Sequence, residues 1–351
     1  MNNRERIDLL EKNGILPEDE LLSLISAYTD EDRLYAAERA RFVSVSVFGK
    51  KIYFRGLIEL TNYCRNDCYY CGIRKSNKCV TRYRLSESDV IECCEYGYSI
   101  GFRTFVLQGG EDMYFTDDIL VKMITDIKSK FPDCALTLSL GEKEKESYEK
   151  YFRAGADRYL LRHETATEAH YAKLHPAELS LSHRLSCLAD LKEIGFQTGC
   201  GIMVGSPFQT REDIVRDLIY MKRLKPEMIG MGPFIPHKDT PFRDYKAGTS
   251  EDTLFLLSIV RLMHPNALIP ATTALGTVKC DGREQGILAG ANVVMPNISP
   301  SDLRKNYLLY DNKIGTSDDA SESVARMTKC VNDIGYEVVV DRGDYKEGGI
   351  A

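Results

Sequence analysis

The sequence has no apolar run that approaches the roughly 18 residues needed to cross a bilayer. Its N-terminus starts with a charged helical pattern and lacks the apolar core of a secretory signal. It also has no cluster of basic residues, because the net charge is -6 and the lysines and arginines are scattered. These absences argue against a membrane or a nucleic acid as partner, and they predict a cytoplasmic protein.

A disulfide framework is missing as well. Eleven cysteines, an odd number without regular spacing, are typical of a reducing compartment. The composition, with 43% hydrophobic and 28% charged residues, is that of a globular protein, and 351 residues suffice for one large domain or two smaller ones. Seven cysteines lack ligand spacing and are interpreted as packing residues: Cys93, Cys94, Cys134, Cys187, Cys200, Cys280 and Cys330.

Residues 1–47 carry apolar side chains at helical spacing, which predicts an N-terminal helical cap. In residues 48–351, short apolar runs alternate with polar loops and amphipathic segments, and a closing segment follows at the C-terminus. The predicted strands are Tyr53 to Leu60, Arg103 to Gln108, Cys134 to Leu140, Asp157 to Leu161, Gln197 to Val204, Met228 to Met231, Ala267 to Pro270 and Ala291 to Met295. The predicted helices cover about residues 86–100, 116–130, 142–153, 182–194, 210–223, 250–263, 282–289 and 300–308.

Strands that alternate with helices pair in parallel through crossover units, and eight such repeats close a barrel. The predicted fold class is therefore α/β, with an eight-stranded (β/α)8 barrel of TIM type; an incomplete six-stranded barrel is the alternative. Chemistry in such a barrel gathers at the C-terminal ends of the strands. The predicted strands are indeed followed by a cysteine loop, by glycine-rich loops and by several charged or hydroxyl side chains.

The most informative stretch is the C-x3-C-x2-C motif of Cys64, Cys68 and Cys71, which follows the first predicted strand. Three thiolates can bind three irons of a 4Fe-4S cluster and leave the fourth iron open. Zinc is the weaker interpretation, because a structural site needs four ligands and the nearest candidates, Cys79 and His163, lie eight and ninety-two residues beyond Cys71. Three chance packing cysteines are a further alternative. The polar neighbours of the motif favour a cluster loop instead.

Two glycine-rich segments follow predicted strands. Gly109-Gly110-Glu111 ends the second strand, and residues 199–205 around Met203 form the fifth. Each can be a plain turn in which glycine relieves limits on φ. After a C-x3-C-x2-C loop, however, they resemble the segments of radical S-adenosylmethionine (SAM) enzymes in which the backbone meets the methionine amino group and the adenosine.

Two arginines lie on the fourth predicted strand. Side chains two residues apart share one face of a strand, so Arg158, Arg162 and Glu164 point the same way, with the guanidinium groups about 13 Å apart. If that face is the barrel interior, an unpaired arginine costs several kcal/mol and needs an anion. Glu164 is the internal candidate, and a SAM carboxylate or an anionic substrate is the external one; an orientation toward the helices is the alternative. Further polar groups expected at this cavity are Thr137, Thr272 and Thr273.

Three further side chains are weaker candidates. Tyr307 and Tyr310 lie three residues apart on a helix expected after the eighth strand, from which their phenols could reach the barrel mouth, although lone tyrosines are more often core residues. His163 ends the fourth strand, where a hydrogen-bonding role is favoured over metal ligation.

Together these motifs resemble the FeFe-hydrogenase maturase family HydE, a radical SAM group related to biotin synthase and methylornithine synthase. The similarity runs from about residue 50 to about residue 310. The segments that carry it are the cysteine loop through Arg74, Asn77-Lys78, Arg82-Tyr83-Arg84, Leu107 to Asp112, Gly155 to Arg162, Gly232 to Pro236, Pro270 to Ala274 and Gly290 to Asn297.

The resemblance implies a complete barrel and assigns roles position by position. It implies that the cluster is bound by Cys64, Cys68 and Cys71. It implies that SAM meets Tyr70, Gly109, Gly110, Glu111, Ser139, Glu164, Arg184, Met203 and Ile235, with Arg184 at the carboxylate and Glu164 at the ribose. It implies that the substrate cavity is lined by Gln108, Thr137, Arg158, Arg162, Thr272, Thr273, Met295, Tyr307 and Tyr310.

The resemblance also implies the reaction and the partners. SAM is cleaved reductively at one 4Fe-4S cluster, and the resulting 5'-deoxyadenosyl radical acts on an iron precursor bearing cysteine, CO and cyanide during assembly of the H-cluster. The implied partners are a small organometallic or amino-acid-derived anionic substrate, other hydrogenase maturases, and an electron donor such as ferredoxin or flavodoxin. Two alternatives stay open: a HydE-like paralogue or a radical SAM enzyme of the methylornithine synthase or biotin synthase type, and a noncatalytic iron–sulfur scaffold.

One departure from the family pattern concerns a second cluster. Many members carry three more cysteines, and the matching positions in this sequence are Gly315, Ser323 and Arg326. A single cluster is therefore expected.

Overall fold

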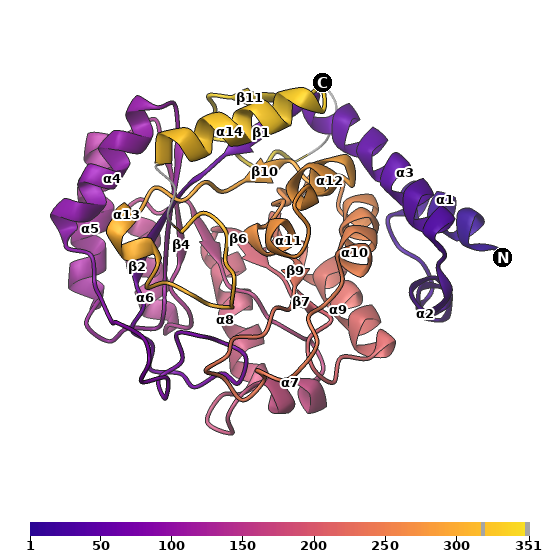
Figure 1. The fold of residues 1–351 in the computed structure, drawn as a ribbon, viewed down its shortest axis with the longest axis horizontal. Coiled ribbons are helices and arrows are strands. Elements are labelled where there is room, and N and C mark those ends of the chain that lie inside the picture. Colours follow the sequence, from indigo (N-terminus) through magenta and orange to yellow (C-terminus); the bar gives the residue numbers. More distant parts are fainter. Residues whose placement is uncertain (317–319, 348–351) are drawn as a thin grey trace.

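The computed structural model describes residues 1–316 and 320–347. The chain begins with three helices, α1 (Asn3–Asn13), α2 (Glu18–Ala27) and α3 (Asp30–Phe48), as the periodicity predicted. Capping boxes start two of them, with Asn2 and Glu5 at α1 and Thr29 and Asp32 at α3. These helices pack on the outside of α9 and α10, at the right of Figure 1.

The first predicted strand is two strands. β1 (Lys51–Phe54) and β2 (Gly56–Thr61) belong to different sheets, and Arg55 lies at the break. β1 pairs in parallel with β10 (Val293–Val294) on one side and with β11 (Glu337–Val339) on the other. The prediction of one continuous strand was wrong because Arg55 turns into the barrel interior, and the chain changes sheets there.

The strands form a closed barrel. A six-stranded parallel sheet runs in the order β2, β3 (Thr104–Gly109), β4 (Ala135–Ser139), β5 (Arg158–Leu160), β6 (Gln197–Cys200) and β8 (Met228–Ile229). Three isolated parallel bridges complete the circuit, from Met228 to Leu268, from Pro270 to Val293, and from Asn297 back to Leu57. The eight-stranded fold class is confirmed, although the seventh strand consists only of such bridges.

The fifth predicted strand divides into two, and a further short strand follows the sixth. β7 (Met203–Val204) and β9 (Gly232–Pro233) pair with each other beyond the ends of β6 and β8. At Gly201, which separates β6 from β7, φ is +156° and an added Cβ would lie 1.9 Å from the Gly230 carbonyl oxygen. This close approach of the two chains requires glycine.

Helices surround the strands, as Figure 1 shows. They are α4 (Glu87–Ser99), α5 (Asp117–Lys130), α6 (Lys145–Arg153), α7 (Glu168–Leu174), α8 (Leu181–Ile194), α9 (Arg211–Leu224), α10 (Ser250–Met263), α11 (Thr273–Val278), α12 (Gly282–Leu288), α13 (Ser301–Arg304) and α14 (Ala320–Asp333). Three of them, α7, α11 and α14, were not predicted. α13 is shorter than predicted, so Tyr307 and Tyr310 lie beyond its end rather than on a helix. No helix among the described residues is both long enough and apolar enough to cross a bilayer.

The two faces of each strand separate the main core from the barrel lumen. Leu107 of β3 and Leu138 of β4 belong to the main hydrophobic core, which the helices share. Because side chains alternate along a strand, Val106 and Thr137 face the opposite side, the lumen. The same alternation directs Glu59 of β2 into the lumen, where it is fully buried.

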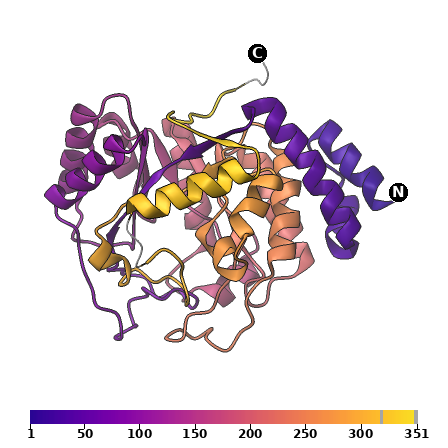
Figure 2. The same ribbon diagram turned by 45° about the horizontal axis from the view of Figure 1, so that its top comes forward.

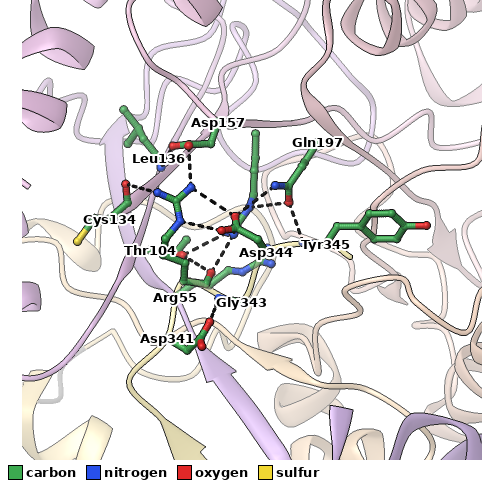
Figure 3. Close-up of polar contacts among 12 residues, drawn as sticks. Arg55, Thr104, Cys134, Leu136, Asp157, Gln197, Asp341, Gly343, Asp344 and Tyr345 are labelled. Atoms are coloured by element: carbon green, nitrogen blue, oxygen red, sulfur yellow. Dashed lines mark hydrogen bonds and ion pairs between the residues drawn. The ribbon is translucent and has the colours of Figure 1, made fainter. Parts of the chain in front are cut away.

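The C-terminal segment lies against the end of the barrel where the strands start, here called the floor, and Figure 3 shows Asp344 among side chains that include Thr104, Asp157 and Gln197. After β11, Asp344 accepts a hydrogen bond from Arg158 Nη2 at 2.7 Å and one from Gln197 Nε2 at 3.2 Å. Arg342 binds Asp157 at 2.8 Å and Asp344 at 2.7 Å. That this tail acts as a closing segment of the barrel domain stays a prediction; residues 348–351 lie outside the described residues.

Candidate active site

The three motif cysteines lie on one loop between β2 and α4. Arg82 holds this loop together, because its guanidinium donates to the carbonyl oxygens of Asn62, Ile73 at 2.8 Å, Arg74 at 2.7 Å and Asn77 at 3.1 Å. Four carbonyl acceptors on one planar group explain how an irregular loop keeps one shape.

The thiols fit a cluster. Burial raises the pKa of Cys64 and of Cys68, and it raises that of Cys71 to about 12. Cys71 and Cys64 add to the rise in the pKa of Cys68, and binding iron has to displace the thiol protons. Among the described residues, no three Cys, His, Asp or Glu side chains are close enough to hold a single metal ion. A 4Fe-4S cluster puts each cysteine on a different iron and takes wider spacing.

The Gly-Gly-Glu segment ends β3 directly against the cysteine loop. An added Cβ on Gly110 would lie 2.2 Å from the Tyr63 carbonyl oxygen and 2.8 Å from Cys64 Cβ. Glu111 accepts from the Glu142 amide at 3.0 Å and from Arg65 Nε at 3.0 Å. The Glu111 side chain therefore ties two strand ends to the loop; contact of these residues with SAM stays a prediction.

Arg184 and Glu164 both contact Arg162, just beyond the end of β5. Arg184, on α8, pairs with the buried Glu142 and donates to the Arg162 carbonyl oxygen at 2.8 Å. Glu164 takes a left-handed φ of 64°, which is unusual for a residue other than glycine, and its Oε2 lies 2.7 Å from Arg162 Nη2. The internal pairing of Arg162 with Glu164 is confirmed. Their predicted roles toward SAM remain untested.

An apolar wall lies beside the cysteine loop. Met203 of β7 packs with Leu174, Phe234 and Phe242, and Tyr69 and Tyr70 of the cluster loop pack against this group. The Tyr70 hydroxyl lies 3.1 Å from Nε2 of His175. The wall offers an aromatic and thioether surface of the kind that accepts a flat base, and Ile235 follows Phe234 at its edge.

Polar side chains fill the lumen below this wall. Gln108 donates to the Tyr307 hydroxyl at 3.3 Å, and Lys313 pairs with Glu59 while donating to the Tyr307 carbonyl oxygen at 2.9 Å. Thr137 Oγ1 is buried and has no hydrogen-bond partner among the described residues. Ser139, at the end of β4, lies beside Gln108 in register.

The remaining predicted cavity residues divide among three places. Arg158 lies on the floor, fully buried and paired with Asp344, so the partner found there is not Glu164. Thr272 caps the N-terminus of α11 through the Leu275 amide. Thr273 and Met295 line a side cavity, together with Lys313. Tyr310 is partly buried, and burial raises the pKa of its hydroxyl to about 12. That these residues contact substrate stays a prediction.

The structure tests the predicted hydrogen-bonding role of His163 and the predicted packing role of Cys280. His163 is fully buried and Nδ1 accepts from the Gly201 amide at 3.3 Å, which confirms the hydrogen-bonding role. Cys280 is exposed, so its assignment to packing was wrong; it lies on the turn between α11 and α12. The positions matched to a second cluster, Gly315, Ser323 and Arg326, line the side cavity that contains Thr273.

Sequence reasoning missed three groups in this region. His175 orients Tyr70, but it follows a seven-residue helix too short to show a periodicity. Lys313 lies in an irregular loop and reaches Glu59 across 254 positions of sequence. Arg55 enters the lumen, and the signal was present, since Arg55 and Glu59 are the charged residues of the apolar run from Tyr53 to Leu60.

Comparison with known proteins agrees with this geometry. Residues 58–220 match the radical SAM superfamily. The [FeFe] hydrogenase maturase subunit HydE of Thermotoga maritima is 40% identical over 348 residues, which cover 99% of this chain and 98% of that protein. A 3-methylornithine synthase of Methanosarcina acetivorans is 29% identical over 316 residues, 89% of this chain and 88% of that protein.

Solved structures share the fold. A methylornithine synthase superposes with a TM-score of 0.84 at 25% identity, covering 95% of this chain and 97% of that chain. The [FeFe]-hydrogenase maturase HydG superposes with a TM-score of 0.80 at 19% identity, covering 96% and 75%. The protein is a radical SAM enzyme that uses a 4Fe-4S cluster and SAM, and it belongs to the family of the [FeFe] hydrogenase maturase subunit HydE.

Proposed function

We propose that this enzyme acts in the cytoplasm on a small anionic iron precursor bearing cysteine, CO and cyanide, during assembly of the H-cluster. Its kinship with the maturase HydE supports this substrate class. The observation that carries the proposal is a set of buried N–H donors facing the lumen. Arg55 Nε and Nη2 and Arg162 Nε have no hydrogen-bond partner among the described residues. Such donors favour an anionic ligand, because an unmet buried cation is costly.

Different residues of the chain would bind the cluster and SAM. Cys64, Cys68 and Cys71 would hold the cluster, which supplies the electron that cleaves SAM when both are bound. Arg184, fixed by Glu142, would meet the SAM carboxylate, and Tyr70 with Met203 would enclose the adenine.

The lumen completes the proposed site below SAM. Its buried walls keep water away from a reactive carbon radical, which otherwise attacks whatever lies nearest. Thr137 and Arg162 would orient the substrate there, since both keep an unpaired donor. The proposed partners are other hydrogenase maturases and an electron donor such as ferredoxin or flavodoxin.

One observation favours a second candidate, an amino-acid substrate as in the methylornithine synthases. Glu59 Oε2 is buried and has no hydrogen-bond partner among the described residues. A carboxylate oxygen in this position could hold a substrate ammonium. Lys313 already offsets the Glu59 charge, which makes this the weaker candidate.

The test is anaerobic reconstitution followed by reduction, addition of SAM and then of the synthetic iron-cysteine-dicarbonyl-cyanide precursor. We expect about four irons per chain, release of 5'-deoxyadenosine, and an adenosylated or rearranged precursor. Cys68→Ala should lose SAM cleavage. Cys79→Ala is the matched control, because Cys79 is exposed and outside the motif.

The outcomes separate the candidates. SAM cleavage with an unchanged precursor would refute this substrate and leave the amino-acid alternative, which isotopically labelled lysine or ornithine can then probe. Failure of SAM cleavage in the reduced, iron-loaded enzyme would instead favour the noncatalytic scaffold.

A further inference from the structure

A cavity of about 220 Å³ lies between the barrel and three of its outer helices. Its walls come from α11, α12 and α14, from the loop of residues 313–315, and from the chain around β10. In Figure 2 the yellow helix α14 lies across the orange helices of this region. Cys280 and Ile314 are exposed, whereas Ile287 and Val294 are buried, so the cavity runs inward from the surface.

The cavity passes through the wall of the barrel. Ile287 and Val331 belong to the main core outside the strands, but Leu57 and Met295 are on the alternate, lumen-facing side of their strands. The opening coincides with the weakest part of the barrel, where single bridges join Pro270 to Val293 and Leu57 to Asn297. After Pro270 the seventh strand turns into α11, which begins at Thr273, so only a short stretch of it pairs with the eighth strand.

Arg283 brings a positive charge to this opening, beside Arg326 of the same wall. Its guanidinium contacts the Met327 sulfur at 3.2 Å and Thr273 Oγ1 at 3.3 Å, and neither neighbour carries a charge. No carboxylate of the described residues forms an ion pair with it. Glu284 is in the same wall, where it hydrogen-bonds Cys330, and Lys313 is paired with Glu59. The Glu284 charge acts on Arg283 without forming an ion pair with it, and a buried cation without a paired carboxylate attracts an anion.

We infer that this cavity is a binding site for a small organic anion such as a carboxylate, held by Arg283 where the barrel wall opens. A volume of about 220 Å³ is below the roughly 300 Å³ at which sites for drug-sized ligands begin, which excludes SAM or a nucleotide. The apolar walls from Ile287 and Val294 suit the carbon part of such a ligand.

The site adjoins the lumen. Burial raises the pKa of Tyr310 to about 12, and both Arg283 and Arg162 lie near enough to oppose that rise. The arginine of the side cavity and an arginine of the lumen thus both act electrostatically on Tyr310. That this cavity serves the substrate site rests on the proposed function, whereas anion binding at Arg283 does not.

Cys280 provides the test, because it lines the cavity and is exposed. The cluster-loaded enzyme is alkylated with iodoacetate, an anion, and with iodoacetamide, its neutral counterpart, and the rates at each cysteine are measured by peptide mass spectrometry. We expect the iodoacetate rate at Cys280 to saturate with concentration. At Cys280, the ratio of the iodoacetate rate to the iodoacetamide rate should fall about fivefold in Arg283→Gln, which is the effect of removing one charge near the surface.

Two controls make the result decisive. Arg283→Lys keeps the charge and should keep most of the ratio, which a merely structural role of Arg283 would not predict. Cys79, exposed on the distant cluster loop, should show the same ratio in all three proteins. Linear kinetics at Cys280 together with an unchanged ratio in Arg283→Gln would overturn the anion site. Failure of precursor turnover would leave this result untouched and count only against the proposed function.

Discussion

At the scale of single residues, the site depends on two backbone positions. Gly110 lets the end of β3 touch the cysteine loop, since any side chain there would meet the Tyr63 carbonyl oxygen and Cys64. Glu164 adopts a left-handed φ that costs of the order of 1 kcal/mol or more, and its ion pair with Arg162 holds it there. Strain of this kind is common where a side chain must face a ligand.

Gly110→Ala should therefore weaken the cluster site. The new methyl group has to push the loop backbone away, at a cost of about 1–3 kcal/mol, and this moves Cys64. We expect at least a fivefold fall in the rate of 5'-deoxyadenosine formation, with less iron bound per chain. Gly230→Ala is the control, because an added Cβ there would have its nearest neighbour at 3.9 Å. Equal losses in the two variants would contradict this account.

His175 makes a second prediction, on pH. Burial lowers its pKa to about 3, so the folded protein keeps this imidazole neutral while the unfolded chain takes up a proton below about pH 6.5. The stability due to neutral His175 is thus present above pH 6.5 and is lost as pH falls toward 3. Between pH 7.5 and 5.5 the loss is about 1.4 kcal/mol. In metal-free protein, the unfolding free energy of His175→Gln should fall less than that of wild type between pH 7.5 and 5.5. If the two unfolding free energies fall in parallel with pH, neutral His175 does not contribute this stability.

At the scale of elements, the sequence predicted the helices and strands whose residue pattern is set by burial. Buried parallel strands such as β3 and β4 are continuous apolar runs, and their helices follow at regular spacing, so both were found within a residue or two. The failures have physical causes. α7 has only seven residues, and the seventh strand ends at Pro270, whose ring limits further pairing. Contacts between distant loops, such as Lys313 with Glu59, leave no local pattern.

The cluster loop is the element whose order depends most on one side chain. Arg82→Lys keeps the charge, but a point-like ammonium cannot serve four carbonyl oxygens in one plane. We expect iron content after reconstitution to fall to half or less, and SAM cleavage to fall with it. Arg103→Lys is the control, since Arg103 also binds carbonyl oxygens but lies away from the loop. An iron content equal to wild type would show that the loop keeps its shape without Arg82.

At the scale of the whole molecule, the C-terminal segment of the chain covers one end of the barrel. β11 extends the small sheet of β1 and β10, and the residues after it cover the floor, so the two ends of the catalytic region are joined. Arg158 and Arg342 share Asp344 there, which offsets two cations with one carboxylate and the help of Asp157.

Asp344→Asn tests that balance. The buried Arg158 would lose its only carboxylate partner among the described residues, and because Asp344 itself is one-third exposed we expect a loss of about 2–3 kcal/mol at pH 7. Arg342 and Arg158 hold the pKa of Asp344 far below its usual value, so its contribution is present above about pH 4 and disappears as pH falls further. The difference in unfolding free energy between wild type and variant should therefore narrow in acid. Asp333→Asn, which removes the exposed partner of Lys329, should cost less than about 0.5 kcal/mol. A floor that merely fills space would instead show a pH-independent difference.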